Sequence, residues 1–236
     1  PGEGTRGVAT LPANVGCYEK FRGDAEVQQR NIIDLLEATR RDARFSLLPE
    51  TAVPGYYWEP TLAELPGEEL PGDFWQELAD TLRSRCPEAL LLTGANTLVR
   101  YEPGTQSPTA RRNRLDGSYY DIFNTAVGLD SAGRVQLHHK GRLVIGVENT
   151  PTWIFDILRF LVIDLGGTLG QIGKSTHGTA FGHAATQVGP AICYEGLYGD
   201  FYGDFIRRRA AFLAIISNDG GLGVTPGYRQ LFTNPS

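Results

Sequence analysis

Val188–Tyr198 reads VGPAICYEGLY, an apolar run that closes on a cysteine. The run up to Ile192 has the character of a buried strand, and Gly196 and Gly199 indicate that the chain then bends into its next element. The pattern predicts a strand-to-helix elbow with Cys193 at the bend. A thiol there lies at one end of a sheet, near helix amides that stabilise a thiolate. The alternative from this segment alone is a small buried hydrophobic residue.

Segments of strand character alternate with amphipathic segments on either side of this elbow. We expect strands at Val8–Val15, Phe45–Leu48, Leu90–Leu98, Tyr119–Leu129, Arg134–His139, Phe181–Val188, Ala191–Cys193 and Ala211–Ser217. We expect helices at Asp24–Asp42, Phe74–Arg85, Trp153–Asp164 and Asp200–Arg209, and a further one beginning in Tyr228–Phe232. We expect loops at Pro54–Pro71 and Tyr101–Ser118. The alternation predicts a mixed α/β layered domain.

The composition is that of an ordinary globular protein. The chain has 236 residues, 41% of them hydrophobic and 21% charged, which suits a single α/β domain over residues 1–236. A net charge of −5 makes nucleic acid an unexpected partner. The chain has no methionine, so we expect it to be part of a longer protein. Its most apolar segment, Trp153–Leu169, is interrupted by Asp156, Arg159 and Asp164, which predicts a soluble chain without a membrane span.

The cysteines and histidines give no sign of a structural cofactor. Cys17, Cys86 and Cys193 are too few for a disulfide framework and leave at most a Cys17–Cys86 bridge. His138 and His139 are adjacent in an expected strand and therefore face opposite sides of it. That arrangement does not suggest a zinc site. We predict that the protein needs no metal or organic cofactor.

Three residues of complementary chemistry each follow an expected strand. Glu50 follows FSLLP, Lys140 follows VQLHH, and Cys193 closes VGPAI. Strand ends on the same edge of a sheet converge, so these three side chains are candidates for one nucleophilic centre. In that centre the carboxylate is the general base, the thiol attacks a carbonyl, and the ammonium stabilises the oxyanion.

Each of the two supporting residues also has a simpler interpretation. Glu50 follows a proline at a strand end and has the alternative role of capping a turn. Lys140 is one of only three lysines, beside Lys20 and Lys174, in a chain that carries 22 basic residues. A sequence that otherwise uses arginine favours a compact ammonium where a pocket is too tight for a guanidinium, although chance placement is the competing explanation.

Four longer segments resemble a known family. They are LLPETAVPG, YYDIFNTAVGLDSAGRVQLHHKGRLVIGVENTP, GPAICYEGLYGDF and AAFLAIISNDGGLGVTPGYRQ. In order and spacing they resemble the carbon–nitrogen hydrolase (nitrilase) superfamily, and most closely the extracytoplasmic domains of apolipoprotein N-acyltransferases. The resemblance implies a four-layer α-β-β-α sandwich, here without its last C-terminal strands and without the family's membrane-spanning helices. It also implies the base, lysine and nucleophile roles given above.

The resemblance extends to residues around the substrate. KGRLVIGVENTP is similar to the acyltransferase pattern with an essential glutamate, which is Glu148 here. CYEG is similar to the family's Cys-Tyr-Glu segment, which implies that Tyr194 and Glu195 are substrate-binding pocket residues. Pro54–Pro71 and Trp153–Leu169 become candidate arms that present apolar surface to lipid, with ordinary loop packing as the alternative.

The reaction implied by the resemblance is a two-step acyl transfer. A phospholipid gives a fatty acyl chain to Cys193 as a thioester, and the N-terminal amine of a diacylglyceryl lipoprotein then takes it. The implied location is the periplasmic face of the bacterial inner membrane. Two alternatives stay open: a soluble amidase, in which water resolves the acyl-enzyme, and an inactive remnant that binds lipid or protein.

Overall fold

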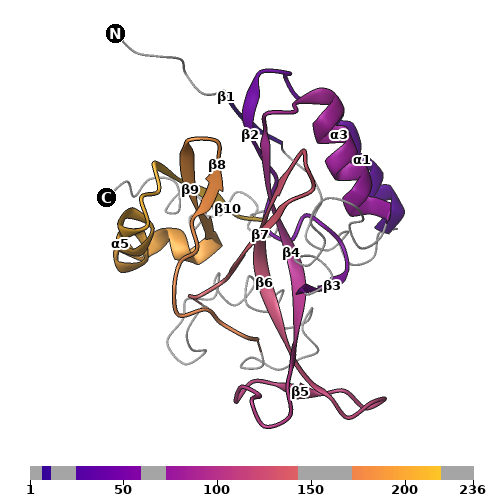
Figure 1. Cartoon of the computed structure of the whole chain (residues 1–236), viewed down its shortest axis with the longest axis vertical. Helices are drawn as coiled ribbons and strands as arrows, with labels where there is room; N and C mark the ends of the chain where they lie inside the picture. Colours follow the sequence, from indigo (N-terminus) through magenta and orange to yellow (C-terminus); the bar gives the residue numbers. More distant parts are fainter. Residues whose placement is uncertain (1–6, 12–24, 60–72, 143–171, 219–236) are drawn as a thin grey trace, which may run out of the picture.

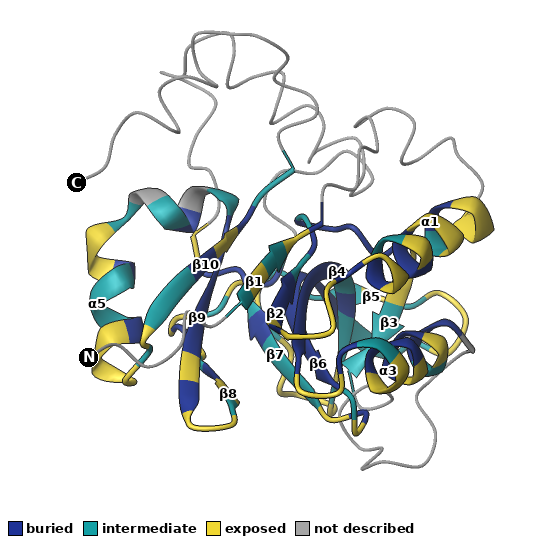
Figure 2. Ribbon diagram, turned by 90° about the horizontal axis from the view of Figure 1, so that it is seen from above, coloured by how far each residue is buried: buried dark blue, intermediate teal, exposed yellow. Residues whose placement is uncertain are grey.

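The computed structural model describes residues 7–11, 25–59, 73–142 and 172–218. The described elements form four layers, which Figure 2 shows edge-on: two helices, a large sheet, a small sheet and a further helix. The helices are α1 (Ala25–Glu37), α3 (Asp73–Arg85), the 3-10 turn η2 (Cys193–Leu197) and α5 (Gly199–Arg207). This is the α-β-β-α arrangement expected from the sequence.

The large sheet has seven strands within the described residues, in the order β1-β2-β4-β6-β5, with β3 beside β4 and β7 beside β6. They are β1 (Gly7–Thr10), β2 (Ala43–Leu47), β3 (Tyr56–Trp58), β4 (Leu90–Tyr101), β5 (Arg111–Arg112), β6 (Tyr119–Asp130) and β7 (Val135–His139). β2 runs parallel to β4, and β4, β6 and β7 are successively antiparallel. β2 and β7 therefore run in the same direction and end at the same edge of the sheet.

The small sheet has the order β10-β9-β8, with β8 (Phe181–His183), β9 (Thr186–Ile192) and β10 (Phe212–Ile216). β8 and β9 form an antiparallel hairpin. β9 and β10 are parallel, and the chain between them runs through η2 and α5. Figure 1 shows this unit beside the large sheet, with α5 on its outer side. The connection places the first residue of η2 where β9 ends.

Alternating side chains along the strands supply separate cores on the two faces of the large sheet. Leu91 in β4 packs with Trp75 and Leu78 of α3, whereas its neighbour Leu92 packs with Phe181 of the small sheet. A third core lies between the small sheet and α5, where Ala191 meets two phenylalanines of the helix. Period-two alternation along β4 thus accounts for both covered faces of the sheet.

Two expectations about the first half of the chain are wrong in part. Pro54–Pro71 was expected to be a loop, yet β3 lies within it and pairs in parallel with β4. Aromatic residues favour strands, and Tyr57 packs edge-on against Trp75 with ring centroids 5.4 Å apart. Tyr101–Ser118 was also expected to be a loop, yet β4 continues into it as far as Tyr101 and β5 pairs with β6.

The strand expected at Phe181–Val188 is divided by a turn. Ala184 has a φ of 50°, a left-handed conformation that ends β8 and reverses the chain into β9. Of the strand expected at Val8–Val15, the part up to Thr10 is confirmed and residues 12–15 lie outside the described residues. The other expected strands and helices within the described residues are confirmed, with ends that shift by a few residues. The helices expected at Trp153–Asp164 and Tyr228–Phe232 lie outside the described residues. Among the residues that are described, no helix is long and apolar enough to span a membrane.

Candidate active site

Glu50 lies in a turn that follows β2 and folds over β4. Gly94 of β4 donates its N–H to Pro49 O at 3.1 Å, and its own O accepts from Val53 N at 3.1 Å. Residues 50–52 form the turn between these two hydrogen bonds. The turn lies directly over Gly94, where a Cβ would come within 2.2 Å of Thr51 N. Thr51 itself has a φ of 47°. Glycine at 94 is therefore what lets the Glu50 turn rest on the face of the sheet.

Lys140 follows β7 and meets Glu50 directly. Its Nζ donates to Glu50 Oε1 at 2.7 Å, and both side chains are almost fully buried. Asn124 of β6 completes the contact, because its Nδ2 donates to the same Glu50 oxygen at 2.6 Å and its backbone O accepts from Lys140 N at 2.8 Å. Glu50 and Lys140 follow β2 and β7, which are not neighbours, and Asn124 lies on β6, one of the strands between them. No sequence pattern singles out this asparagine.

The charge around Lys140 is unusual for a buried lysine. Burial by itself lowers the pKa of its ammonium, but electrostatic attraction to Glu50, with further contributions from Cys193 and Glu195, outweighs burial and raises the pKa of Lys140 above its ordinary value. Lys140 is therefore a cation at neutral pH. A fixed buried cation is suited to stabilising an oxyanion and unsuited to accepting a proton.

Cys193 lies at the elbow that the sequence predicts. β9 ends at Ile192 and η2 begins with Cys193, which is half-buried and packs against the core between the two sheets. Its φ is 48°, an unfavourable value for a residue with a side chain. Such strain costs about 1–3 kcal/mol and is found most often at functional sites. Cys193 is also one of the groups whose electrostatic interaction raises the pKa of Lys140.

Glu195 is fully buried two residues after the cysteine. Its Oε2 accepts from Ile192 N at 2.8 Å, and its Oε1 accepts from the N–H of Gly141. His138 also contacts Oε2, with Nε2 at 3.2 Å. A carboxylate with these three partners is well satisfied in a dry interior. Its neighbour Tyr194 lies in η2 with a side chain that is outside the described part, and Glu148 lies outside the described residues.

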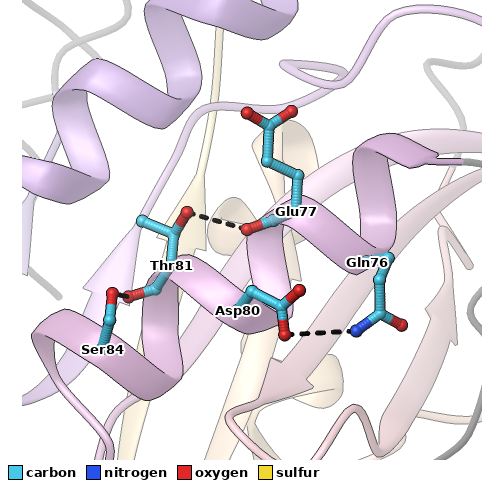
Figure 3. A pocket seen from close by; sticks show the side chains of 5 residues that line it. All are labelled: Gln76, Glu77, Asp80, Thr81 and Ser84. Atoms are coloured by element: carbon cyan, nitrogen blue, oxygen red, sulfur yellow. Dashed lines mark hydrogen bonds between the residues drawn. The ribbon is translucent and has the colours of Figure 1, made fainter.

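A second feature is a shallow hollow on the polar side of α3, which Figure 3 shows. Its lining is hydrogen-bonded within the helix: Gln76 donates to Asp80 at 3.2 Å, and Thr81 donates to the backbone O of Glu77 at 2.7 Å. Its lining includes neither cysteine nor lysine, and α3 lies on the face of the large sheet opposite the small sheet. The described residues also contain no group of three histidine, cysteine or acidic side chains placed to hold a metal ion.

Together, the four layers and the thiol, ammonium and carboxylate between the two sheets define an α-β-β-α sandwich of the nitrilase class. The model of the carbon–nitrogen hydrolase family matches residues 19–232, so the chain belongs to that family. This confirms the superfamily resemblance found in the sequence.

Two known proteins are similar to the chain, one in sequence and one in fold. The chain is 28% identical over 229 residues to an apolipoprotein N-acyltransferase of Chlorobaculum tepidum, and the match covers 93% of this chain but only 40% of that protein. A double mutant of the amidase from Nesterenkonia sp. AN1, solved with acrylamide, superposes with a TM-score of 0.51 at 15% identity. That superposition covers 92% of this chain and 68% of the amidase, and at this identity it shows the fold alone.

Proposed function

We propose that the chain is the catalytic domain of an N-acyltransferase that moves a fatty acyl chain from a phospholipid to the N-terminal amine of a diacylglyceryl lipoprotein. The observation that carries the chemistry is the buried 2.7 Å contact between Lys140 Nζ and Glu50 Oε1, together with a cysteine at the end of β9 that interacts electrostatically with the same ammonium. The similarity to the Chlorobaculum tepidum N-acyltransferase supports the choice of substrates.

In the first step Glu50 takes the thiol proton, and the Cys193 sulfur attacks an ester carbonyl of the phospholipid. Lys140 stabilises the oxyanion of the tetrahedral intermediate. When that intermediate collapses, the ester C–O bond breaks and Glu50 returns its proton to the departing alkoxide. The products are a lysophospholipid and a thioester on Cys193.

In the second step the free amine of the lipoprotein attacks the thioester carbonyl. Glu50 accepts a proton from the attacking nitrogen, and the amide forms as the C–S bond breaks. The proton held by Glu50 then returns to the cysteine sulfur, which restores the starting state. Every proton is accounted for by one carboxyl group, so the cycle needs neither a metal nor an organic cofactor.

Residues beyond the described core complete the proposal. We propose that Glu148 and Tyr194 bind substrate, and that Trp153–Leu169 and the part of Pro54–Pro71 beyond β3 interact with lipid. We further propose that a membrane supplies the acyl donor and that the domain acts at the periplasmic face of a bacterial inner membrane. The same base, lysine and thiol serve an amidase equally well if water takes the place of the amine, and this is the competing reaction.

Intact-protein mass spectrometry after incubation with phospholipid vesicles tests the proposal. We expect an acyl adduct on Cys193 that is absent in Cys193→Ala and Glu50→Gln and that disappears on adding a diacylglyceryl-cysteine peptide with a free amine. Turnover of small amides without a phospholipid adduct would establish the amidase instead. If neither donor reacts, the chain is a binding module.

A further inference from the structure

We propose that His138 is a positioning residue that acts through Glu195 to hold the two halves of the active site together. The proposal rests on the thiol chemistry proposed for Cys193. One half of the site, with Lys140, is at the end of a strand of the large sheet, and the other half, with Cys193, is at the end of a strand of the small sheet. A side chain that holds both halves in place therefore has to contact both sheets.

Glu195 provides that bridge through backbone contacts. One carboxylate oxygen accepts from the N–H of Gly141, the residue that follows Lys140. The other accepts from the N–H of Ile192 at 2.8 Å, and Ile192 precedes Cys193. A rotation of this one carboxylate therefore changes the backbone next to both reacting groups. Gly141 has little freedom to adjust, because a Cβ there would lie 2.8 Å from Ser175 O.

His138 fixes the orientation of the carboxylate. Its Nδ1 lies 3.2 Å from the backbone N of Thr179, which is a donor, so Nδ1 accepts and the ring proton is on Nε2. Nε2–H then donates to Glu195 Oε2 at 3.2 Å. The ring itself is held by two aromatic neighbours, Phe201 and Phe205, with centroids 5.8 and 5.6 Å away. The contact with Thr179 thus makes Nε2 the nitrogen that donates to Glu195.

The energetic reason for this arrangement is the burial of Glu195. Its side chain and that of His138 are both 0% exposed, so water cannot replace a lost partner. Without the imidazole donor, the carboxylate turns toward its two remaining amide donors and displaces them. Sub-ångström displacement of a nucleophile relative to its oxyanion stabiliser is enough to slow catalysis.

The rate of Cys193 alkylation by iodoacetamide, followed by peptide mass spectrometry, tests this role without any acyl donor. His138→Phe keeps the ring among its aromatic neighbours and removes the donor, and we expect alkylation to slow by about tenfold to hundredfold. His138→Gln keeps an N–H donor at similar reach and restores most of the rate. His139→Phe, on the opposite face of the same strand, is the matched control and leaves the rate unchanged.

Each outcome of the alkylation experiment supports or overturns the positioning role of His138. An unchanged alkylation rate in a folded His138→Phe, checked by circular dichroism, would overturn it. If that variant does not fold, His138→Asn, which cannot reach Glu195, is compared with His138→Gln; equal rates overturn the proposal and a faster Gln variant supports it. If Cys193 of the unaltered protein reacts no faster than free cysteine, the proposed thiol chemistry fails first and the positioning role fails with it.

Discussion

β7 presents two adjacent histidines to opposite faces of the large sheet, and each meets a glutamate. His138 and Glu195, between the two sheets, are both 0% exposed. His139 and Glu59, on the other face, are 25% and 17% exposed. The residue types and the strand are the same, so the two pairs differ only in where alternation along the strand places them.

The partners of the two glutamates show what this placement decides. Glu195 is shared between His138 and backbone amides beside Lys140 and Cys193. Glu59 is shared between His139 and the hydroxyl of Thr97, which donates to it at 2.7 Å. His139 also stacks on Phe123 with ring centroids 4.0 Å apart. Only the pair between the sheets is linked to the candidate active site.

The largest expected effect is that of Lys140→Met, which removes the buried cation between the two sheets. Glu50 then remains buried beside Asn124 without its cation, and removal of one member of a buried ion pair lowers the free energy of unfolding by about 3–5 kcal/mol. Loss of the oxyanion stabiliser also lowers the rate of Cys193 acylation by about 10²–10³-fold. Urea denaturation and adduct formation measure the two effects.

Lys174→Met is the matched control, because Lys174 is exposed. Its free energy of unfolding should stay within about 0.5 kcal/mol of the unaltered protein. If the two methionine variants have equal free energies of unfolding, the buried Lys140–Glu50 pair makes no net contribution to stability.

The position of these residues at strand ends was predictable, because the apolar runs before Glu50, Lys140 and Cys193 are distinct in the sequence. The two histidines could also be assigned to opposite faces from alternation alone. Their partners could not, because the contact between His138 and Glu195 depends on how the small sheet packs on the large one. A sequence pattern describes one element at a time and does not record this packing.

Asn124 shows a different limit of sequence reasoning. It lies inside β6, paired with Asn96 of β4, in a strand that otherwise reads as ordinary buried sequence. Its contact with Glu50 requires both the β4–β6 register and the turn that folds over Gly94. In the sequence, these two features are marked only by a glycine in one strand, Gly94, and a polar residue in another, Asn124. Such a residue is found only when the strands are assembled.

A second, smaller effect is expected when the Glu50 turn is lifted from the sheet by Gly94→Ala. The added Cβ would lie 2.2 Å from Thr51 N and 2.7 Å from Glu50 Cα, so backbone must move. Overpacking of this kind costs about 1–3 kcal/mol. Because the displaced turn carries the base, Cys193 acylation should fall as well, and stability and adduct formation should drop together.

Gly182→Ala provides the comparison for that variant. Gly182 lies in β8 and has nothing within 4 Å of an added Cβ, so the substitution should leave both stability and acylation unchanged or slightly raise stability. A Gly94→Ala protein that behaves like Gly182→Ala would show that the turn has room to adjust and that glycine is not required beneath Glu50.

Groups on both faces of the large sheet should make stability depend on pH in the alkaline range. The folded-state pKa of Lys140 is raised by the charges around it, chiefly Glu50, against an opposing effect of burial. The pKa of Tyr101, on the other face, is raised by burial and by its bond to Asp121. For both groups the unfolded chain loses its proton first, so stability is fully present below about pH 10 and falls as the pH rises above it.

Variants show which residues cause the loss of stability at alkaline pH. Urea denaturation between pH 8 and 11 should show a shallower decline in Lys140→Met and, separately, in Tyr101→Phe. Tyr57 and Tyr202 also have raised pKa values and leave a residual slope of the same sign in either variant. A stability profile that rises with pH in this window would contradict the protonated state assigned to Lys140.

The smallest expected effect is that of His139→Phe on stability. The variant keeps an aromatic ring for Phe123 to stack on and removes a partly exposed pair with Glu59, for which water and Thr97 remain as partners. Partly exposed pairs contribute about 0–1 kcal/mol, so the free energy of unfolding should change by no more than that. His138→Phe leaves a fully buried carboxylate with one donor fewer and should cost about 1–3 kcal/mol. Paired urea titrations of the two variants measure the difference, and equal costs would mean that burial does not separate the two faces of β7.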